Sequence, residues 1–407
     1  MRGPAAAAPL LIGSEIYRGS TYGPKHPLAI PRVSTTLDLI RALGWLDPAR
    51  YIDSPRATPD ALARFHHPEY IAALRRAEET RRADPADRER FGIGAHGNPV
   101  FREVFSRPAT GAGGTTFAAR LTLAGGGTVH VPGGGTHHGQ PARASGFCYL
   151  NDAVLGLLAW LDGGLDNLLY VDIDAHHGDG VEDAFRDDPR VFTLSIHEKE
   201  RWPHTGRVED RAGGHARNLP VPPGFNDSEM LWLLHQAVLP IARHLHPQAV
   251  MLQCGADALE EDPLSRLSLS NNAHWGVVRA LMGMSPRFVV LGGGGYNPWA
   301  VGRCWAGVWG TLNGHAIPER LPPTAEAVQR GLSWDRSAGR SPPEHWFTTL
   351  RDPPRPGVVR TEVQRLAAGA VRDLPPPPGA VTPETGPARP ARRPPALPAE
   401  GCAPPAE

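Results

Sequence analysis

The segment Tyr170-Val-Asp172-Ile-Asp174-Ala-His176-His177-Gly-Asp179-Gly180 decides the fold, because an apolar run ends there in carboxylates and imidazoles. The apolar residues that lead into it are typical of a strand buried on both faces: Leu168, Leu169, Tyr170, Val171 and Ile173. The two-residue period of a strand places Asp172, Asp174 and His176 on one side. Three potential metal ligands therefore share one side of a strand end.

The motif alone also fits a second interpretation, a hydrogen-bonded polar cluster that caps a helix starting near Gly180. Asp residues are common at helix N-termini, where their carboxylates accept hydrogen bonds from backbone N–H groups. The two interpretations make different demands on the rest of the chain. A metal site needs further ligands and catalytic groups at other strand ends, whereas a helix cap needs none.

The composition is that of a globular protein with a large core. The chain has 407 residues, 41% of them hydrophobic, which allows one large domain or two ordinary ones at about 100 to 200 residues per domain. Its 42 basic and 42 acidic residues give a formal net charge of zero. This balance excludes recognition of nucleic acid or anionic lipid through bulk charge. We therefore expect no nucleic-acid or membrane partner.

The cysteines indicate a reducing compartment. The four lie far apart and form no Cys-x-x-Cys pair, which argues against a disulfide framework and against a thiolate zinc site: Cys148, Cys254, Cys304 and Cys402. The apolar stretch 5–12 is short and interrupted by Pro9, unlike a signal peptide, and no segment is long and apolar enough to span a bilayer. We expect a cytoplasmic protein.

Short apolar runs alternate with longer helical patterns over residues 10–317, which predicts an α/β domain with an open parallel sheet flanked by helices. Residues 318–373 are expected to form an irregular extension packed on or near this domain. Residues 374–407 are rich in Pro and Ala and are expected to form a disordered tail. The expected helices are 34–46, 58–80, 112–123, 151–161, 227–245, 272–284 and 298–312.

Five apolar runs end in reactive residues, and the carboxyl ends of parallel strands meet at one edge of a sheet. The opening motif is one of the five ends. The other runs and the residues that follow them are 128–131 before His137 and His138, 191–196 before His197, 249–254 before Asp257, and 288–291 before four glycines and Tyr296. A helix cap does not explain reactive residues at the other four ends. The pattern therefore favours a metal site.

Asp174, His176 and Asp257 form our predicted ligand set. Two carboxylates and one imidazole bind Zn²⁺ well and leave one coordination position for water, which a catalytic zinc site requires. Such a site suits metal-assisted hydrolysis. The sequence therefore predicts an active site at the C-terminal ends of the strands.

The remaining polar residues supply groups for acid–base catalysis. A histidine pair, here His137 and His138, can remove a proton from water and return one to the leaving group when a carboxylate orients each ring. Asp172 and Asp179 are the spare carboxylates. Tyr296 follows a glycine-rich turn, where it can donate a hydrogen bond to a developing oxyanion.

Five segments, in order along the chain, resemble the zinc-dependent histone deacetylase superfamily, and the bacterial branch labelled acetoin utilisation proteins is nearest. The resemblance covers roughly residues 10–312 and implies an arginase-like α/β fold. It also implies hydrolysis of the acetyl amide of acetyl-lysine, in a protein or peptide, or of a related acetylated amine. The segments are Gly-Gly-Thr-His137-His138, Arg143-Ala-Ser-Gly-Phe147-Cys-Tyr-Leu-Asn-Asp152, 171–181, Leu252-Gln-Cys-Gly-Ala-Asp257 and Leu291-Gly-Gly-Gly-Gly-Tyr296.

The resemblance also implies roles for individual residues. It places Zn²⁺, or Fe²⁺ as the alternative, on Asp174, His176 and Asp257. Asp172 orients His137, and Asp179 orients His138, which is the general base and acid. Tyr296 is the tyrosine that stabilises the transition state. The acyl-lysine tunnel corresponds to Gly146, Phe147 and Trp202, with Leu264 near the mouth. A structural K⁺ would use Asp172, Ser195 and carbonyls of Asp174, His176 and Ile196, and Arg32 matches an arginine associated with an internal product channel.

Two departures from the family pattern concern the rim of the tunnel. Peptide-binding members commonly place an Asp just before a Pro-Val-Phe loop, where this chain reads His96-Gly97-Asn98. The loop Trp202-Pro-His204-Thr-Gly206 carries an imidazole where glycine is usual. His204 is either an exposed rim residue or a residue that selects substrate. The missing carboxylate weakens the case for recognition of the backbone of a protein substrate, so small acetylated amines stay among the expected substrates.

Three alternatives compete with an acetyl-lysine deacetylase. An acetylpolyamine or other small-amine deacetylase would be favoured by an acidic residue at the tunnel mouth, where this chain has Leu264. A non-catalytic acyl-amine binding protein would keep the fold, but every polar residue needed for catalysis is present. A ureohydrolase with two Mn²⁺ ions would need further carboxylates where His137 and His138 stand. The oligomeric state stays open.

Overall fold

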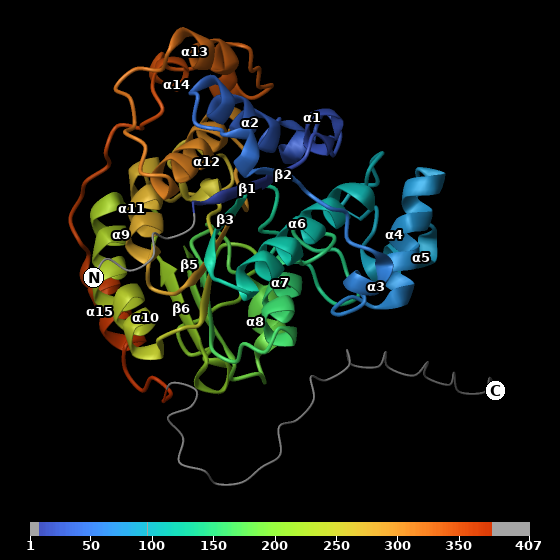
Figure 1. The fold of residues 1–407 in the computed structure, drawn as a ribbon, viewed down its shortest axis with the longest axis horizontal. Coiled ribbons are helices and arrows are strands. Elements are labelled where there is room, and N and C mark those ends of the chain that lie inside the picture. Colours follow the sequence, from blue (N-terminus) through green and yellow to red (C-terminus); the bar gives the residue numbers. More distant parts are fainter. Residues whose placement is uncertain (1–7, 96, 377–407) are drawn as a thin grey trace, which may run out of the picture.

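The structure, a computed structural model, describes residues 8–95 and 97–376 (Figure 1). Eight strands form one sheet in the order β2-β1-β3-β8-β7-β4-β5-β6, and every pairing is parallel. The predicted α/β class with an open parallel sheet is confirmed. The strands are β1 Leu10–Gly13, β2 Tyr51–Asp53, β3 Gly127–Val131, β4 Leu168–Asp172, β5 Val191–Glu198, β6 Ala216–Val221, β7 Ala249–Gln253 and β8 Arg287–Leu291.

Helices cover both faces of the sheet (Figure 1). Alternate residues of β4 enter two hydrophobic clusters, Leu169 and Val171 on one face and Leu168 and Tyr170 on the other. Because both faces are buried, β4 reads as a continuous apolar run. The first face carries α2 Val33–Ala42, α9 Asp227–Leu233, α10 Leu239–Leu245, α11 Asn271–Leu281 and α12 Pro298–Leu312, and the second carries α4 Pro68–Thr80, α6 Ser106–Leu123, α7 Asp152–Asp162 and α8 Asp179–Phe185.

The expected helices are present, although α2 and α11 end three to four residues early and three others differ more. The pattern over 58–80 forms two helices, α3 Pro59–Leu62 and α4, because Pro68 starts a new first turn. Helix α6 begins at Ser106, six residues before the expected start. The pattern over 227–245 contains a π-helical turn at Leu234–Val238 between α9 and α10. The shorter helices α1 Ile16–Gly19 and α5 Pro85–Phe91 lie outside the expected set.

Residues 318–373 contain three helices, α13 Pro323–Arg330, α14 His345–Thr348 and α15 Thr361–Ala370, joined by Pro-rich segments. Helix α13 packs on α2, α14 packs on α12, and α15 packs on β6 and α9. The extension is therefore more regular than its composition suggests. Of the expected tail 374–407, residues 377–407 lie outside the described part of the chain. Within the described part, no helix combines the length and apolar character needed to cross a membrane.

Candidate active site

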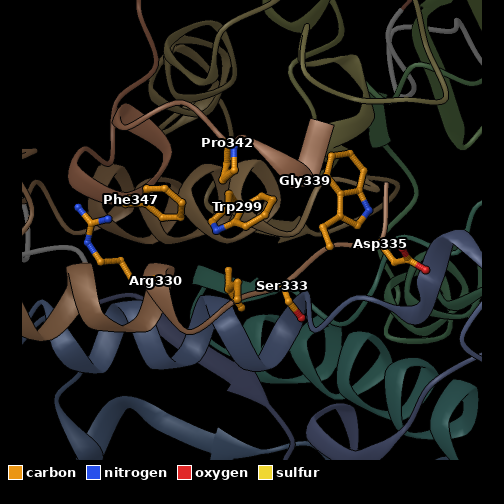
Figure 2. Close-up of a pocket in the computed structure, with 9 residues that line it drawn as sticks. Trp299, Arg330, Ser333, Asp335, Gly339, Pro342 and Phe347 are labelled. Atoms are coloured by element: carbon orange, nitrogen blue, oxygen red, sulfur yellow. The ribbon is translucent and has the colours of Figure 1, made fainter. Parts of the chain in front are cut away.

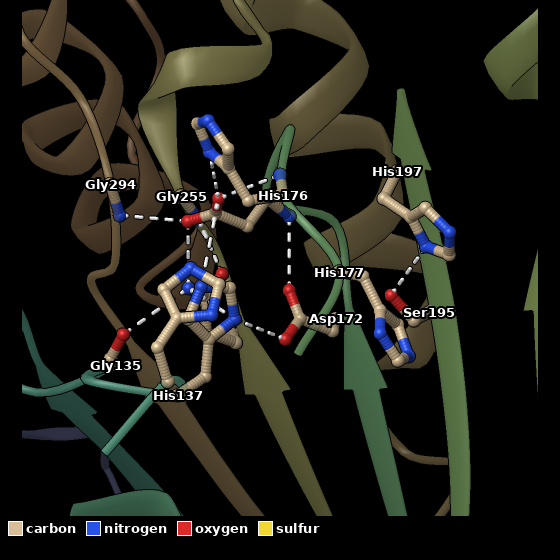
Figure 3. Close-up of polar contacts among 12 residues, drawn as sticks. Gly135, His137, Asp172, His176, His177, Ser195, His197, Gly255 and Gly294 are labelled. Atoms are coloured by element: carbon tan, nitrogen blue, oxygen red, sulfur yellow. Dashed lines mark hydrogen bonds and ion pairs between the residues drawn. The ribbon is translucent and has the colours of Figure 1, made fainter. Parts of the chain in front are cut away.

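Polar side chains from four adjacent strands meet at the C-terminal edge of the sheet (Figure 3). The strands are β3, β8, β7 and β4, and their following loops carry His137 and His138, Tyr296, Asp257, and Asp174 with His176, respectively. The parallel register brings the ends of these strands to one level, with Asp172 beside Gln253 on β7. Four of the five strand ends identified in the sequence therefore supply the centre of the site.

Asp174, His176 and Asp257 form a compact group, called here the metal triad. Nδ1 of His176 lies 3.2 Å from Oδ1 of Asp174 and 3.0 Å from Oδ2 of Asp257. Potential ligand atoms of all three residues lie within 4.8 Å of one another, and all three side chains are buried. A single imidazole nitrogen cannot satisfy two carboxylates with one proton, whereas a cation can attract all three ligand atoms.

Two glycines form a close backbone cradle around the triad. A Cβ added to Gly255 would lie 2.1 Å from Oδ2 of Asp174, and one added to Gly294 would lie 2.0 Å from Oδ2 of Asp257. The N–H group of Gly294 also donates to Oδ2 of Asp174 at 2.8 Å. The glycine-rich turn after β8 therefore has a direct steric role, because any side chain there would enter the space around the carboxylates.

The electrostatics of the triad fit a metal cation. Burial raises the pKa of Asp257 to about 6, with a further contribution from Asp174. Burial alone would raise the pKa of Asp174 as well, but His137 and His176 hold it well below its ordinary value. Burial opposes protonation of His176, yet Asp174 and Asp257 raise its pKa to about 10. Two carboxylates thus draw positive charge onto the imidazole between them, and this donor set suits Zn²⁺ or Fe²⁺.

The two predicted catalytic histidines lie side by side, each with its own carboxylate. Nδ1 of His137 lies 2.7 Å from Asp172, Nδ1 of His138 lies 2.7 Å from Asp179, and the ring centroids are 3.9 Å apart. Because a carboxylate only accepts hydrogen bonds, each Nδ1–H donates, and each Nε2 is left as the second nitrogen of its ring.

The two imidazoles differ in protonation. Burial alone would lower the pKa of His137, but Asp172 and Asp174 raise it to about 9. Burial and the neighbouring charge of His137 lower the pKa of His138 to about 4, against the opposing effect of Asp179. At neutral pH His138 is therefore neutral and able to accept a proton, whereas His137 in the metal-free protein is protonated.

Tyr296 faces the same cavity from the turn after β8. Burial, with Asp257 and Asp174 nearby, holds the pKa of its phenol well above the ordinary value, so the hydroxyl keeps its proton as a hydrogen-bond donor. The backbone N–H of Tyr296 donates to Oδ2 of Asp262 at 2.6 Å, and Oδ1 of Asp262 accepts from Leu264 N at 2.9 Å. Asp262 thus fixes both the tyrosine turn and the loop of Leu264.

A narrow cavity of about 40 Å³ leads to these groups. Gly146 and Phe147, two of the residues expected at the acyl-lysine tunnel, line it together with both histidines and Tyr296. Trp202 is not among the lining residues; its ring meets His138 edge-on at 4.6 Å and lies against Gly146, where an added Cβ would come within 2.3 Å. Leu264 is half-buried in the cluster that also holds Phe147 and Tyr296.

Of the residues expected around K⁺, Asp174 and His176 belong to the metal triad, and the others lie on β4 and β5. Asp172 and Ser195 are register partners on β4 and β5, and Ile196 is buried next to Ser195. Oδ1 of Asp172 accepts from Asp174 N at 3.1 Å, and Oγ of Ser195 lies 2.9 Å from Nδ1 of His197. A K⁺ site stays a prediction. Arg32, the predicted channel residue, is half-buried and donates from Nη1 to the carbonyl of Gly293 at 2.6 Å.

Gly97 and His204, the residues at the two departures from the family pattern, both have a positive φ. Gly97 has φ +85° and lies against Phe147, whose ring would be 3.3 Å from an added Cβ. His204 has φ +65°, a left-handed conformation in which glycine is favoured, and its side chain is exposed. His96 lies outside the described residues.

Two polar residues of the site were missed in the sequence. The hydroxyl of Tyr170 donates to Oδ2 of Asp172 at 2.7 Å, and Nε2 of Gln253 donates to Oδ2 of Asp174 at 2.8 Å. A signal for Tyr170 was present, because the strand period puts residues 170 and 172 on the same side. Gln253 is the last residue of β7 and a polar one after an apolar run, which is a weaker signal.

A larger cavity, about 380 Å³, lies between α12 and the extension (Figure 2). It holds one carboxylate and one guanidinium but no imidazole or thiol, so its size does not make it the catalytic site. Its lining residues are Trp299, Arg330, Leu332, Ser333, Trp334, Asp335, Gly339, Pro342 and Phe347.

Comparisons with known proteins agree with the geometry. Residues 26–312 match the histone deacetylase domain. Histone deacetylase 9 of Arabidopsis thaliana is 37% identical over 75% of this chain and 73% of its own length. Acetoin utilization protein AcuC of Bacillus subtilis is 31% identical over 83% of this chain and 89% of its own length.

Solved structures show the same relationship. The crystal structure of an HDAC homologue from Aquifex aeolicus has a TM-score of 0.85 and 35% identity, covering 89% of this chain and 100% of that chain. A structure of an HDAC homologue complexed with SAHA gives the same TM-score, identity and coverage. The family predicted from the sequence segments is confirmed, with AcuC among the relatives. The chain therefore belongs to the histone deacetylase family and is a hydrolase of that family.

Proposed function

We propose that the protein is a metal-dependent amidohydrolase that removes the acetyl group from acetyl-lysine in a protein or peptide, or from a related acetylated amine. The observation that carries the proposal is the convergence of three groups on one narrow cavity. These are the metal triad, a neutral imidazole beside a protonated one, and a phenol that keeps its proton. Together they match the requirements of amide hydrolysis.

Asp174, His176 and Asp257 would hold the metal, with Zn²⁺ as the first candidate and Fe²⁺ as the second. When bound, such an ion supplies Lewis-acid chemistry to a carbonyl oxygen and to water. Gln253 and the Gly294 N–H group orient Asp174 through its Oδ2. These contacts leave Oδ1 of Asp174 on the side of His176.

His138 is assigned as the general base and then the general acid. Its lowered pKa keeps Nε2 unprotonated at neutral pH, and the hydrogen bond from Nδ1–H to Asp179 fixes the tautomer. His138 would take a proton from the attacking water and return it to the amine nitrogen as the C–N bond breaks. His137, with Asp172 and Tyr170 behind it, would carry positive charge beside the reacting carbonyl.

Tyr296 is assigned as the oxyanion donor, because its phenol is protonated and lines the same cavity as the two histidines. The narrow cavity suits the slender alkyl chain of lysine or of an acetylated amine, with Phe147 as an apolar wall. Gly97 offers no side chain for holding a peptide backbone. This feature favours testing small amines beside peptides. A structural K⁺ near Asp172 and Ser195 belongs to the same proposal.

A substrate panel on purified protein of known metal content tests the proposal. The panel compares an acetyl-lysine peptide, free acetyl-lysine, acetylputrescine and acetylspermidine, with released acetate as the measurement. Hydrolysis of the peptide supports an acetyl-lysine deacetylase, and hydrolysis confined to the polyamines supports the small-amine alternative. Binding of SAHA to metal-loaded protein without acetate release from any substrate would instead support the non-catalytic acyl-amine binding protein.

A further inference from the structure

The two aromatic residues beside the predicted tunnel are held in different ways. Phe147 is fixed through its own backbone: its N–H donates to Oδ1 of Asn98 at 3.0 Å, and its carbonyl accepts from the Tyr22 hydroxyl at 3.1 Å. Trp202 has 40% of its surface exposed, and its loop 199–206 is attached mainly at the two ends. Beyond the contacts of its ring with His138 and Gly146, the position of Trp202 therefore also depends on the residues that hold its loop.

The first end of the loop is held by Glu198, a side chain that is buried at the end of β5. Its carboxylate accepts two hydrogen bonds from the Arg201 guanidinium, at 2.7 and 2.8 Å. It also accepts the backbone N–H of Arg266 at 2.8 Å, two residues after Leu264. Glu198 thus joins the Trp202 loop to the loop that carries Leu264.

The second end of the loop is held by His177, the residue of the opening motif that has no role in the proposed mechanism. Nε2 of His177 lies 3.2 Å from Oε2 of Glu182, and Nδ1 lies 2.8 Å from Oγ1 of Thr205. Because Glu182 only accepts, Nε2–H donates to it, which leaves Nδ1 to pair with the Thr205 hydroxyl. The chain Thr205–His177–Glu182 therefore links the rim loop to α8.

Gly206 confirms how closely the loop end fits. An added Cβ there would come within 2.6 Å of the His177 ring and 2.7 Å of the His197 ring, and φ is +75°. The carbonyl of Gly206 lies 3.0 Å from Nε2 of His197. In Figure 3 the rings of His177 and His197 lie together beside Ser195, away from the ring of His176. The imidazoles of His177 and His197 thus pack against the end of the loop at Gly206.

We infer that His177 is a positioning residue that holds the rim loop through Thr205 and thereby keeps Trp202 against His138 at the tunnel. This inference rests on the proposed function, because it assigns the Trp202 loop to substrate binding. The loop would otherwise be free to move at its exposed end. His177 then acts on how well the substrate is held, and not on the chemistry of hydrolysis.

Thr205→Val tests the inference, because it keeps the shape of an exposed side chain and removes only the hydroxyl that reaches His177. We expect KM for an acetyl-lysine peptide to rise about tenfold, since an orphaned ring nitrogen loosens the loop, while kcat changes much less. Hydrogen exchange over residues 199–207 should become faster. Thr205→Ser keeps the hydroxyl and should restore both values. Thr80→Val, at the end of α4, is the matched control and should change neither.

Two results would overturn the inference. Unchanged hydrogen exchange in Thr205→Val would show that the hydroxyl does not hold the loop. Faster exchange with an unchanged KM would show that the loop does not position Trp202. Hydrogen exchange does not depend on turnover, so failure of the proposed function, seen as no acetate release from the unaltered protein, is distinguishable from failure of the loop attachment.

Discussion

The metal triad at the sheet edge and a second cluster, Glu261–His345–Asp352, contain the same kinds of residue, and the second cluster is formed by the segment between β7 and α11 together with the extension. Each has two carboxylates and one imidazole whose potential ligand atoms lie within 4.8 Å of one another. In the second cluster, Arg303 donates to Oδ1 of Asp352, and Arg355 donates to Oε1 of Glu261 at 2.9 Å. Guanidinium groups already occupy the carboxylates there.

The carboxylates of the metal triad have different partners. Within the described residues, the groups that donate to them are backbone N–H groups, the amide of Gln253 and the ring of His176. This difference in partners changes the pKa of the imidazole in each cluster. Carboxylates raise the pKa of His176 to about 10, whereas burial and Arg303 lower the pKa of His345. Compensating charge, and not the list of residue types, separates a metal site from a structural ion network.

Substitution of one predicted ligand in the metal triad is the most direct test of the difference between the two clusters. Asp174→Asn keeps the size of the side chain and removes its charge, so we expect metal content to fall from about one ion per chain to near zero. Lewis-acid chemistry contributes several kcal/mol, so the deacetylation rate should fall at least about a thousandfold. Metal analysis and acetate release are the measurements. Glu261→Gln is the matched control, and loss of metal in that variant would contradict the distinction between the clusters.

The second cluster is expected to matter for stability. Arg303 and Asp352 are both fully buried, so Arg303→Met leaves a buried carboxylate without its partner and should cost about 3–5 kcal/mol in free energy of unfolding. Denaturation in urea measures this loss. Arg64→Met, which breaks an exposed pair with Asp162, should cost less than about 1 kcal/mol. A wild-type-like stability of Arg303→Met would show that the network is dispensable.

Tyr296→Phe separates binding of the metal from catalysis within the first region. The variant loses only the hydroxyl, so we expect kcat to fall by about a hundredfold to a thousandfold, as for loss of one oxyanion donor. Metal content should stay at the level of the unaltered protein. Undiminished turnover on an acetyl-lysine peptide would remove Tyr296 from the mechanism.

The smallest expected effect of the difference between the two clusters is on proton binding. The pKa of His176 lies above its unfolded value of about 6.5, so its protonation stabilises the metal-free fold below pH 6.5, and this contribution is lost as pH rises through about 10. His345, with a lowered pKa, favours the fold in its neutral form. At pH 7.5 we expect binding of Zn²⁺ to release about one proton from His176. Calorimetry in two buffers measures it, and zero release would contradict the raised pKa.

The sequence predicted the elements whose signals are local. The run into Asp172 marked a doubly buried strand, and Pro298 with the capping Asn297 marked the start of α12. Strand β6 was missed because Arg217 and Asn218 read as a polar segment. Arg217 is buried beside Phe192, and its guanidinium donates both to local carbonyls, such as that of Ala216, and to the distant carbonyl of Ala370. Such a side chain becomes compatible with a strand only when α15 is in place.

The site likewise contains residues that the sequence predicted and contacts that it did not. Residue types and strand ends predicted the metal triad, the histidine pair and Tyr296, and the structure brings all of them together. The contacts of Gln253 and Asp262 could not be predicted, because each depends on how a neighbouring loop is placed. The sequence also does not separate the metal triad from the Glu261 cluster, since Arg303 lies 42 residues away from Glu261 along the chain and meets it only after folding.

The order of strands sets the time at which the enzyme can first become active during synthesis. His137 and His138 follow β3, and their carboxylates follow or end β4, but β8 and β7 lie between those two strands in the sheet. Both central strands are made after β3 and β4. At roughly 5 to 20 residues per second, the ribosome needs on the order of ten seconds to proceed from Asp179 to the end of β8. Until then the nascent chain holds both halves of the proposed acid–base machinery without the strands that join them.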